Sequence, residues 1–376
     1  MQEVQRHDFI DALRGVAILG VILVHSSGAV APHSPYLQSL MSYGARGVQL
    51  FYVVSAFALC MSWKERRLNE VSPLRNFYIR RFFRIAPLFY VAIGFYLLLY
   101  GFSPRYWAPN GVEWWFVVVT ALFLHGFHPE TITSVVPGGW SIAVEMNFYL
   151  LLPIFLIHFC NIRAALLLFV SSLTLYLVFR TLLLSVLSPY YPESQHYLVT
   201  GFIFLNFMSH LPVFAMGLVA FLVISIRELP HPVRVYIGIA ALAIAAYVLA
   251  IPSSGLILGN HISSGVWFAL ILLWLRRSPI KLIVNGLTTG LGKISFSMYL
   301  VSFAVMEAFS RLGITAEFSN GDASSIFHFM CILGVTALLS FVSYMTIERG
   351  GVRIGRKVIE GMEWRQRVDR REIGLQ

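Results

Sequence analysis

The sequence predicts an all-α integral membrane protein, a bundle of about ten transmembrane helices with one short re-entrant or interfacial segment. Three observations predict this class. Of the 376 residues, 57% are hydrophobic and 12% are charged, and this charged share is about half that of a typical soluble domain. The mean hydropathy is +0.73. The apolar residues form long runs, and Lys and Arg stand in short clusters between them, as is typical of membrane proteins.

A transmembrane helix needs about 20 apolar residues, with about 17 as the lower limit. Runs that meet this length occupy residues 9–29, 47–63, 82–101, 139–159, 164–187, 200–226, 235–251, 255–275, 290–310 and 324–347. The first run contains charged residues and no small-residue cleavage site follows it, so we expect a retained span rather than a cleaved signal. The run 114–124 is too short to cross and is bracketed by Glu113 and His125.

The distribution of basic residues predicts the orientation. If 114–124 does not cross, most of the 28 Lys and Arg residues fall on one side, which the positive-inside rule identifies as cytoplasmic. If it crosses, the basic tail moves outside and the rule fails. We therefore expect both termini in the cytoplasm, 113–137 re-entering or lying along the outer face, a membrane domain at 1–349 and a basic cytoplasmic tail at 350–376, with no further soluble domain.

Charge and cysteine usage exclude other classes. The net charge of +10 comes from the short clusters and not from a basic domain, so we expect a lipid bilayer as partner and no nucleic acid. Cys60, Cys160 and Cys331 lie within or at the ends of apolar runs. No metal-ligand spacing is present, and we expect neither disulfides nor a metal site.

Ionisable residues inside spans are candidates for function because they are costly there. The first span contains Asp11, Arg14 and His25. Eleven helical steps of about 100° bring His25 back to the face of Arg14, about 16 Å further along the axis. Both then face one groove, with Arg14 near the cytoplasmic boundary. The alternative, left open by spacing alone, is that Arg14 snorkels to the boundary and His25 bonds a neighbour.

A second cluster, Arg80, Arg81 and Arg84, opens the third span. Arg80 and Arg84 are i,i+4 neighbours on one face. Guanidinium groups bind phosphate oxygens in pairs, so these two suit a polyanion such as the pyrophosphate of coenzyme A. The alternative is a topology anchor, and for Arg81 we favour the anchor.

Glu145 follows a Gly-Gly break at the predicted outer end of the fourth span. An unpaired carboxylate there would be costly, and His25 is expected at a similar depth. We therefore expect a His25–Glu145 pair of the kind that fixes the tautomer of a general base. The alternative is a Glu satisfied by backbone donors. Arg180, His210 and Glu307 have no clear partner and are assigned structural roles.

These segments resemble the membrane acyltransferase-3 family. The resemblance rests on Arg14 with ten residues before His25, on residues 47–55 of the second span, and on the arginines that open the third span. It also rests on the segment from Trp140 and Ser141 through Glu145, on the run that contains Tyr299, and on Glu348-Arg349 after the last span. The matches run in order over residues 8–349.

The resemblance implies a ten-span enzyme of the bacterial inner membrane that moves an acyl group, commonly acetyl from acetyl-CoA, onto a carbohydrate hydroxyl. Acceptors of the family include surface glycans and lipid-linked saccharides. It implies catalytic roles for His25, Glu145 and Arg14, and acyl-CoA binding by Arg80, Arg84 and Arg14. Candidate supporting residues are Asp11, Ser55, Trp140, Ser141, Tyr299 and Ser302. The family often has His at the place of Ser302, which leaves donor and acceptor details open.

We therefore predict a membrane O-acyltransferase with acyl-CoA as donor substrate and no permanently bound cofactor. A small molecule such as an antibiotic is the alternative acceptor. A polysaccharide or solute transporter is the alternative from another class, although the sequence shows no inverted repeat that would favour it. The acyl chain, the choice between an acyl-enzyme and direct transfer, and the oligomeric state stay open.

Overall fold

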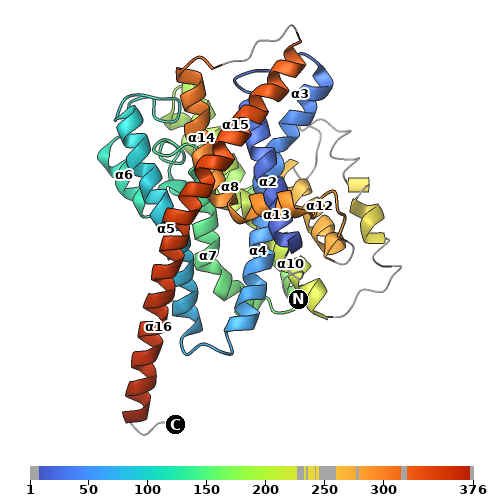
Figure 1. The fold of residues 1–376 in the computed structure, drawn as a ribbon, viewed down its shortest axis with the longest axis vertical. Coiled ribbons are helices and arrows are strands. Elements are labelled where there is room, and N and C mark those ends of the chain that lie inside the picture. Colours follow the sequence, from blue (N-terminus) through green and yellow to red (C-terminus); the bar gives the residue numbers. More distant parts are fainter. Residues whose placement is uncertain are drawn as a thin grey trace.

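The computed structural model describes residues 8–226, 233, 236–241, 243–244, 260–276, 279–314 and 320–372. These residues form a bundle of helices without a β-strand (Figure 1). The helices are α2 (Asp8–Ser26), α3 (Pro35–Ser42), α4 (Gly47–Arg66), α5 (Pro73–Tyr100), α6 (Trp114–Ala121), α7 (Trp140–His158), α8 (Ile162–Leu187), α9 (His196–Leu205), α10 (Phe207–Ile226), α12 (Asn260–Leu275), α13 (Gly286–Lys293), α14 (Ser295–Arg311), α15 (Gly321–Ser343) and α16 (Arg349–Glu372). The all-helical prediction is confirmed for this part of the chain.

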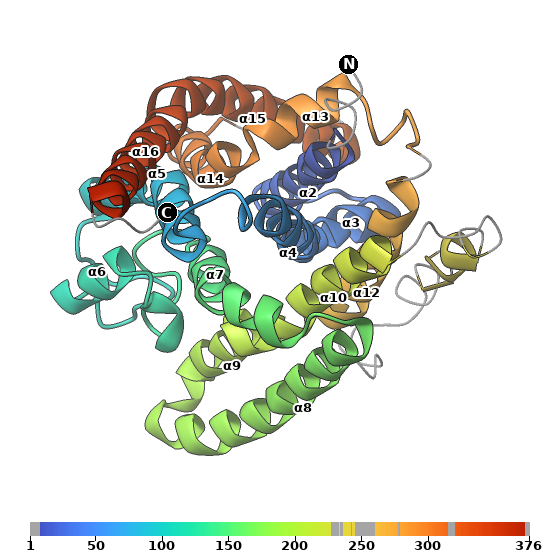
Figure 2. The ribbon, with the colours of Figure 1, turned by 90° about the horizontal axis from the view of Figure 1, so that it is seen from below.

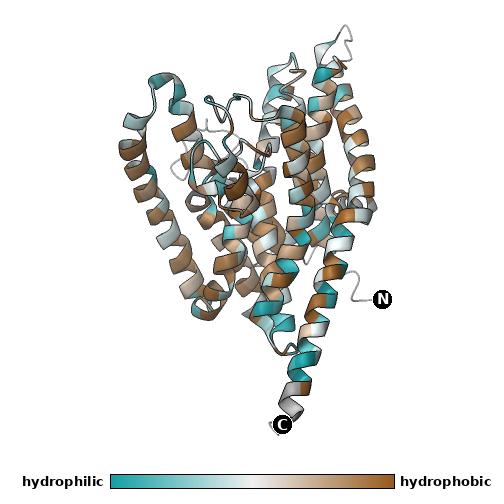
Figure 3. Cartoon of the chain, turned by 90° about the vertical axis from the view of Figure 1, so that its left-hand side faces the viewer, coloured by the Kyte–Doolittle hydropathy of each residue, from teal (hydrophilic) through white to brown (hydrophobic). Residues whose placement is uncertain are grey.

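Most of the predicted spans correspond to helices. Within the described ranges, seven helical segments are long and apolar enough to cross a membrane, or eight if the bent pair α13–α14 is one span. The helix α12 is apolar but shorter, and the predicted span 235–251 lies largely outside the described residues. The chain is thus a multi-pass membrane protein, while the number of about ten spans stays a prediction. Figure 3 shows the apolar residues along the helices of the bundle, with polar residues gathered toward their ends.

Two predicted spans are not single straight helices. The run 290–310 is wrong as one helix, because α13 ends at Lys293 and α14 begins at Ser295, at an angle of 78° to it. The span 200–226 is interrupted at Asn206, whose side-chain oxygen accepts from the Met208 amide at 3.0 Å. Side chains that satisfy backbone donors at a helix start favour such breaks, and apolarity alone does not reveal them.

The short run 114–124 does not cross by itself. Helix α6 contains 8 residues, which span only about 12 Å of a hydrocarbon core of about 30 Å. Turns follow as far as Pro137, with a 3-10 turn at His125–Phe127. The segment between α6 and α7 buries His125, Thr131 and Ser134.

Helix α2 lies at the centre of the bundle, against α4, α13, α14 and α15 (Figures 1 and 2). Small residues allow this close packing, as is common between membrane helices. A Cβ at Gly292 of α13 would collide with the Asp11 carbonyl of α2, and a Cβ at Gly15 would collide with the Thr288 carbonyl of α13. The contact fixes the N-terminal half of α2, including Arg14.

The C-terminal helix α16 continues α15 through a π-turn at Tyr344–Glu348 and extends past the bundle (Figure 1). It packs along the start of α5. The Glu363 carboxylate accepts from the Asn76 side chain at 2.7 Å and from the Val71 amide at 3.0 Å. The predicted tail is therefore a helix docked on α5, while its cytoplasmic placement stays a prediction.

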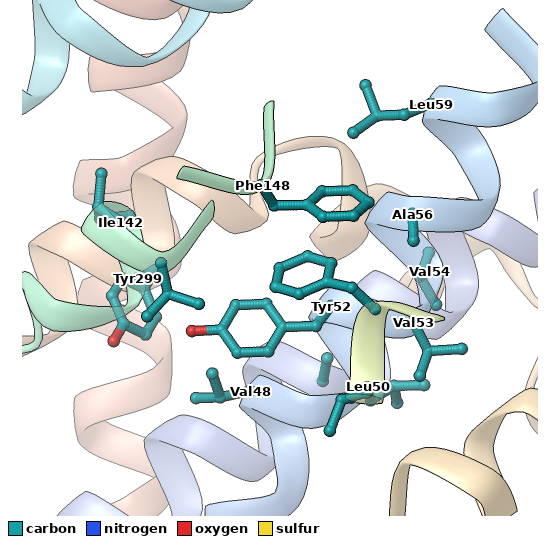
Figure 4. Packing of buried hydrophobic residues seen from close by; sticks show 14 of the residues in the cluster. Val48, Leu50, Tyr52, Val53, Val54, Ala56, Leu59, Ile142, Phe148 and Tyr299 are labelled. Atoms are coloured by element: carbon teal, nitrogen blue, oxygen red, sulfur yellow. The ribbon is translucent and has the colours of Figure 1, made fainter. Parts of the chain in front are cut away.

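Aromatic stacking joins α4, α7 and α10 in the core. The Phe214 ring lies between Phe148, at a centroid distance of 4.0 Å, and Tyr52, at 4.5 Å. Figure 4 shows the Tyr52 hydroxyl pointing toward Ile142 and Tyr299. The hydroxyl donates to the Ser141 carbonyl at 3.4 Å. This cluster holds the central part of α4 against the polar residues described next.

Candidate functional site

A small pocket inside the bundle is lined by three arginines. Arg14 comes from α2, and Arg81 and Arg84 come from α5. Glu145 and Tyr149 of α7 also line it. Its volume is about 70 Å³. We call it the arginine pocket.

The structure places Arg81, and not Arg80, at the arginine pocket. Arg80 forms an ion pair with Glu70 at 2.6 Å and does not line the arginine pocket. Arg81 lines it, with its guanidinium 5.9 Å from the ring centroids of both Tyr149 and Phe77. Arg81, for which we favoured the anchor, thus lies at the pocket in place of Arg80, because Glu70 in the turn before α5 pairs with Arg80. Arg81 and Arg84 are i,i+3 neighbours, so they share the face toward α2 and α7.

Carboxylates outside the pocket hold two of the three arginines. Arg14 donates to Asp11 at 3.3 Å, and Arg84 lies 3.9 Å from Glu348. Glu348 is only 3% exposed and also accepts from the Ser297 hydroxyl at 2.9 Å. Arg81 has no ion pair with a carboxylate among the described residues, and its Nε has no partner. The pocket therefore contains one cationic group, Arg81, that has no ion pair with a described carboxylate.

Glu348 was not selected from the sequence as a site residue. The available signal was an acidic residue directly after an apolar run, which is costly unless paired. Tyr149 was also missed. Its hydroxyl donates to Glu145, one turn earlier on the same helix.

The predicted His25–Glu145 pair is wrong in this structure. Glu145 accepts from the Ser55 hydroxyl at 3.0 Å and from Tyr149, and no hydrogen bond or ion pair joins it to His25. The reason is depth. Glu145 lies five residues into α7, about 7.5 Å along its axis, which places its carboxylate at the level of Arg14. His25 lies at the opposite end of α2.

His25 faces a second, much larger space, which we call the wide cavity. Its volume is about 1370 Å³. The His25 side chain is exposed and makes an edge contact with Phe303 at a centroid distance of 4.9 Å. The imidazole has no hydrogen-bond partner among the described residues, so both ring nitrogens are available to a bound molecule.

The two spaces adjoin at Tyr299 and Val48, which line both. The Tyr299 hydroxyl donates to the Gly138 carbonyl at 2.9 Å and accepts from the Ser141 hydroxyl at 2.8 Å. A Cβ at Gly138, where φ is +72°, would collide with Phe303 and the Tyr299 hydroxyl, so only glycine fits this turn. The expected supporting residues Ser141 and Tyr299 therefore form the wall between the two spaces.

The other supporting residues are placed differently. Ser55 lines the arginine pocket, and Trp140 lines the wide cavity, stacked on His210 at a centroid distance of 5.3 Å. Ser302 is fully buried and donates to the Tyr299 carbonyl at 2.9 Å, so it lines neither space. Arg180, which we expected to be structural, lines the wide cavity.

The bundle thus encloses a pocket lined by arginines, next to a cavity lined by an exposed histidine. These features define a membrane protein with an internal polar site. The chain belongs to the acyltransferase-3 family, because the family model described as an acyltransferase domain matches residues 7–345. It is therefore an acyltransferase.

Curated relatives are similar over part of the chain. The peptidoglycan O-acetyltransferase OatA of Listeria monocytogenes is 29% identical over 169 residues, which are 40% of this chain and 24% of the relative. The putative peptidoglycan O-acetyltransferase YrhL of Bacillus subtilis is 26% identical over 171 residues, 41% of this chain and 24% of the relative. A putative O-acetyltransferase of Staphylococcus aureus is 23% identical over 164 residues, with 39% and 24% covered. The matched part is thus about a quarter of each relative's length. No solved structure matches the chain.

Proposed function

We propose that the protein transfers an acyl group, most simply acetyl, from acyl-CoA to a hydroxyl of a carbohydrate. The observation that carries the proposal is the pair of adjoining spaces, one lined by arginines and the other by His25. The relatives' names, which refer to peptidoglycan O-acetylation or O-acetylation, support the reaction type and a saccharide acceptor.

The arginine pocket suits the donor. A volume of about 70 Å³ is far below the roughly 300–1,000 Å³ of ordinary ligand sites. A whole coenzyme A does not fit into it. The phosphates would bind at the arginines, and only the narrow acyl-bearing end would pass toward Tyr299. The unpaired guanidinium of Arg81 is available for a phosphate oxygen.

The wide cavity suits the acceptor. Its volume of about 1370 Å³ exceeds the range of drug-sized ligand sites, which favours an oligosaccharide or lipid-linked saccharide over the small-molecule alternative. Trp107, Trp140 and Tyr176 contribute aromatic surface to its wall. Such surfaces pack against the apolar faces of sugar rings.

The chemistry needs one base. In the proposed reaction, His25 removes the proton of the acceptor hydroxyl while the oxygen attacks the thioester carbon. An ester C–O bond forms, the C–S bond breaks, and the proton on His25 passes to the coenzyme A thiolate. His is suited to this exchange because its unperturbed pKa lies near neutral pH. An acyl-His25 intermediate would give the same products in two steps.

Glu145 has a different role from the one that the sequence indicated. It accepts hydrogen bonds from Ser55 of α4 and Tyr149 of α7, and it offsets part of the arginine charge. We therefore assign it to positioning the wall of the donor site rather than to orienting His25.

The proposed setting is a bacterial inner membrane, with about ten spans and both termini cytoplasmic. The distribution of Lys and Arg along the chain supports this orientation. The arginine pocket would then open toward cytoplasmic acyl-CoA, and the wide cavity would face the outer side.

The test is acyl transfer by the purified full-length protein in vesicles, with radiolabelled acetyl-CoA and oligosaccharide acceptors. We expect His25→Ala to reduce transfer by about 10²–10⁴-fold while acetyl-CoA binding stays near normal. Wild-type transfer by a well-folded His25→Ala protein would contradict the mechanism. Saccharide uptake into vesicles without ester formation would instead identify a transporter.

A further inference from the structure

The wide cavity is lined by three arginines and, among the described residues, by no Asp or Glu. Arg46 comes from the turn before α4, Arg105 from the segment after α5, and Arg180 from α8. A cavity lined by positive charges without negative ones attracts an anion. The three residues differ in what holds them.

Arg105 is part of the wall. Its guanidinium donates to the Gly101 carbonyl at 2.6 Å, to Ser103 at 3.3 Å and to Ser134 at 3.2 Å. These contacts fix the connection between α5 and α6. The positive charge of Arg105 therefore lies at the cavity, while its N–H groups donate to backbone carbonyls of the protein.

Arg180 is available to a ligand. The buried residues of α8 are Ala165, Leu168, Ser172 and Tyr176, and Arg180 continues this stripe at the same helical spacing. It is therefore on the side of α8 that faces the bundle. Its side chain is exposed and has no ion pair with any described carboxylate. Arginines within spans normally face the interior or water and pair with another group.

Arg46 is the second available cation, on a different wall. Its guanidinium carbon lies 4.3 Å above the Tyr43 ring. Its Nε is buried without a partner, and it has no ion pair with a described carboxylate. Stacking on tyrosine holds the plane of the group, and no hydrogen bond from its outer nitrogens is found among the described residues.

We infer that the acceptor is an anionic saccharide, with a phosphate or carboxylate held by Arg180 and Arg46 while His25 receives the hydroxyl. The inference rests on the proposed function and names its acceptor class. Both groups are planar or tetrahedral oxyanions that arginine binds through two parallel hydrogen bonds. The aromatic side chains Trp107, Trp140 and Tyr176 would pack against the neutral faces of the sugar rings. The two arginines thus select by charge, and His25 is not needed for that selection.

The test compares binding and transfer with three fluorescent tetrasaccharides. One contains a uronic acid, the second is its neutral, carboxyl-reduced counterpart, and the third is an otherwise neutral tetrasaccharide that carries a 1-phosphate. The full-length protein is placed in phosphatidylcholine vesicles, which exclude anionic lipid. We expect the wild type to bind at least one acidic probe more tightly than the neutral one, and which probe is favoured identifies carboxylate or phosphate.

We expect Arg180→Gln and Arg46→Gln to weaken binding of the favoured acidic probe by about 10- to 150-fold each. Binding of the neutral probe and of acetyl-CoA should change little. Arg163→Gln is the matched control, because Arg163 is also exposed on α8 but lies about 26 Å away along the helix.

Equal binding of acidic and neutral probes by the wild type, or an equal loss of both in Arg180→Gln, would overturn the inference. So would a charge preference that Arg163→Gln removes just as strongly. If acidic binding depends on Arg180 but the wild type transfers no acyl group to any probe, the inference stands and the proposed function fails. If all probes are acylated equally well, the proposed function stands and the inference of an anionic acceptor fails.

Discussion

The neighbouring residues Arg80 and Arg81 allow the donor site to be tested with a matched pair of substitutions. Each substitution, Arg80→Gln and Arg81→Gln, removes one positive charge at the same end of α5. Arg81 lines the arginine pocket, whereas Arg80 is held by Glu70 at 2.6 Å. We therefore expect Arg81→Gln to lose acetyl-CoA affinity and Arg80→Gln to lose stability.

Arg81→Gln should weaken acetyl-CoA binding. The guanidinium has no carboxylate partner among the described residues, so a phosphate would supply its main charged contact. A hydrogen bond to a charged group contributes about 1.5–3 kcal/mol, which corresponds to roughly 10- to 150-fold in affinity. Stability should be unchanged or higher, because the variant removes a cation that has no counter-charge in the folded protein.

Arg80→Gln should do the reverse. The Arg80 and Glu70 side chains are 18% and 14% exposed, and the substitution leaves Glu70 with only Arg66 at 3.9 Å. Leaving a partly buried charged partner unsatisfied costs about 1–3 kcal/mol. Acetyl-CoA affinity should stay within about twofold, since Arg80 does not contact the pocket.

The measurements are acetyl-CoA titration and thermal unfolding, both on purified detergent-solubilised protein followed by tryptophan fluorescence. Gel filtration of each variant provides the folding control. A loss of affinity in Arg80→Gln as large as that in Arg81→Gln would refute the placement of the donor phosphates in the arginine pocket.

Three further predictions follow from contacts described above. Glu145→Gln should reduce acyl transfer by no more than about 10- to 150-fold, because Gln keeps an acceptor for Ser55 or Tyr149 but loses the charge. A loss as large as that of His25→Ala in the same transfer assay would instead support the predicted His25–Glu145 pair. Gly292→Ala should destabilise the protein by about 1–3 kcal/mol, because its Cβ would collide with the Asp11 carbonyl. The control is Gly290→Ala, whose Cβ meets nothing within 4 Å and which should stabilise α13 by about 0.5–1 kcal/mol. Equal melting temperatures of the two variants would contradict the α2–α13 contact. Reporter fusions after Glu70 should indicate the cytoplasm and fusions at Ser188 the outside, and a cytoplasmic signal at Ser188 would mean that the segment 113–137 crosses the membrane.

The sequence predicted well what depends on composition and on spacing within one helix. Apolar run length located the helices that correspond to the predicted spans, because a span must satisfy a fixed hydrocarbon thickness. The shared face of Arg14 and His25 follows from helical geometry alone. The bend at Ile294 was not predictable in this way, since it accompanies the close contact between Gly292 of α13 and the Asp11 carbonyl of α2.

Contacts between helices were the part that the sequence did not determine. The depth of Glu145 relative to His25 depends on where α7 begins after the turn at Gly138. The choice between Arg80 and Arg81 depends on a carboxylate in the turn before α5. Both questions concern the relative height of two helices, and no pattern within one helix contains that information.

Helix α2 holds a cation and a histidine about three helical turns apart. Gly15 and Gly292 hold its first half tightly against α13, which fixes Arg14 at the arginine pocket. The rest of the same rigid helix then brings His25 into the wide cavity, on the same face and about 16 Å away. Tyr299 and Val48 lie between the two spaces. One helix thus sets the distance between the site that would hold the donor's phosphates and the site where its acyl group would be transferred. A change in this spacing by one residue would rotate His25 by about 100° and remove it from the cavity, even if every other contact were kept.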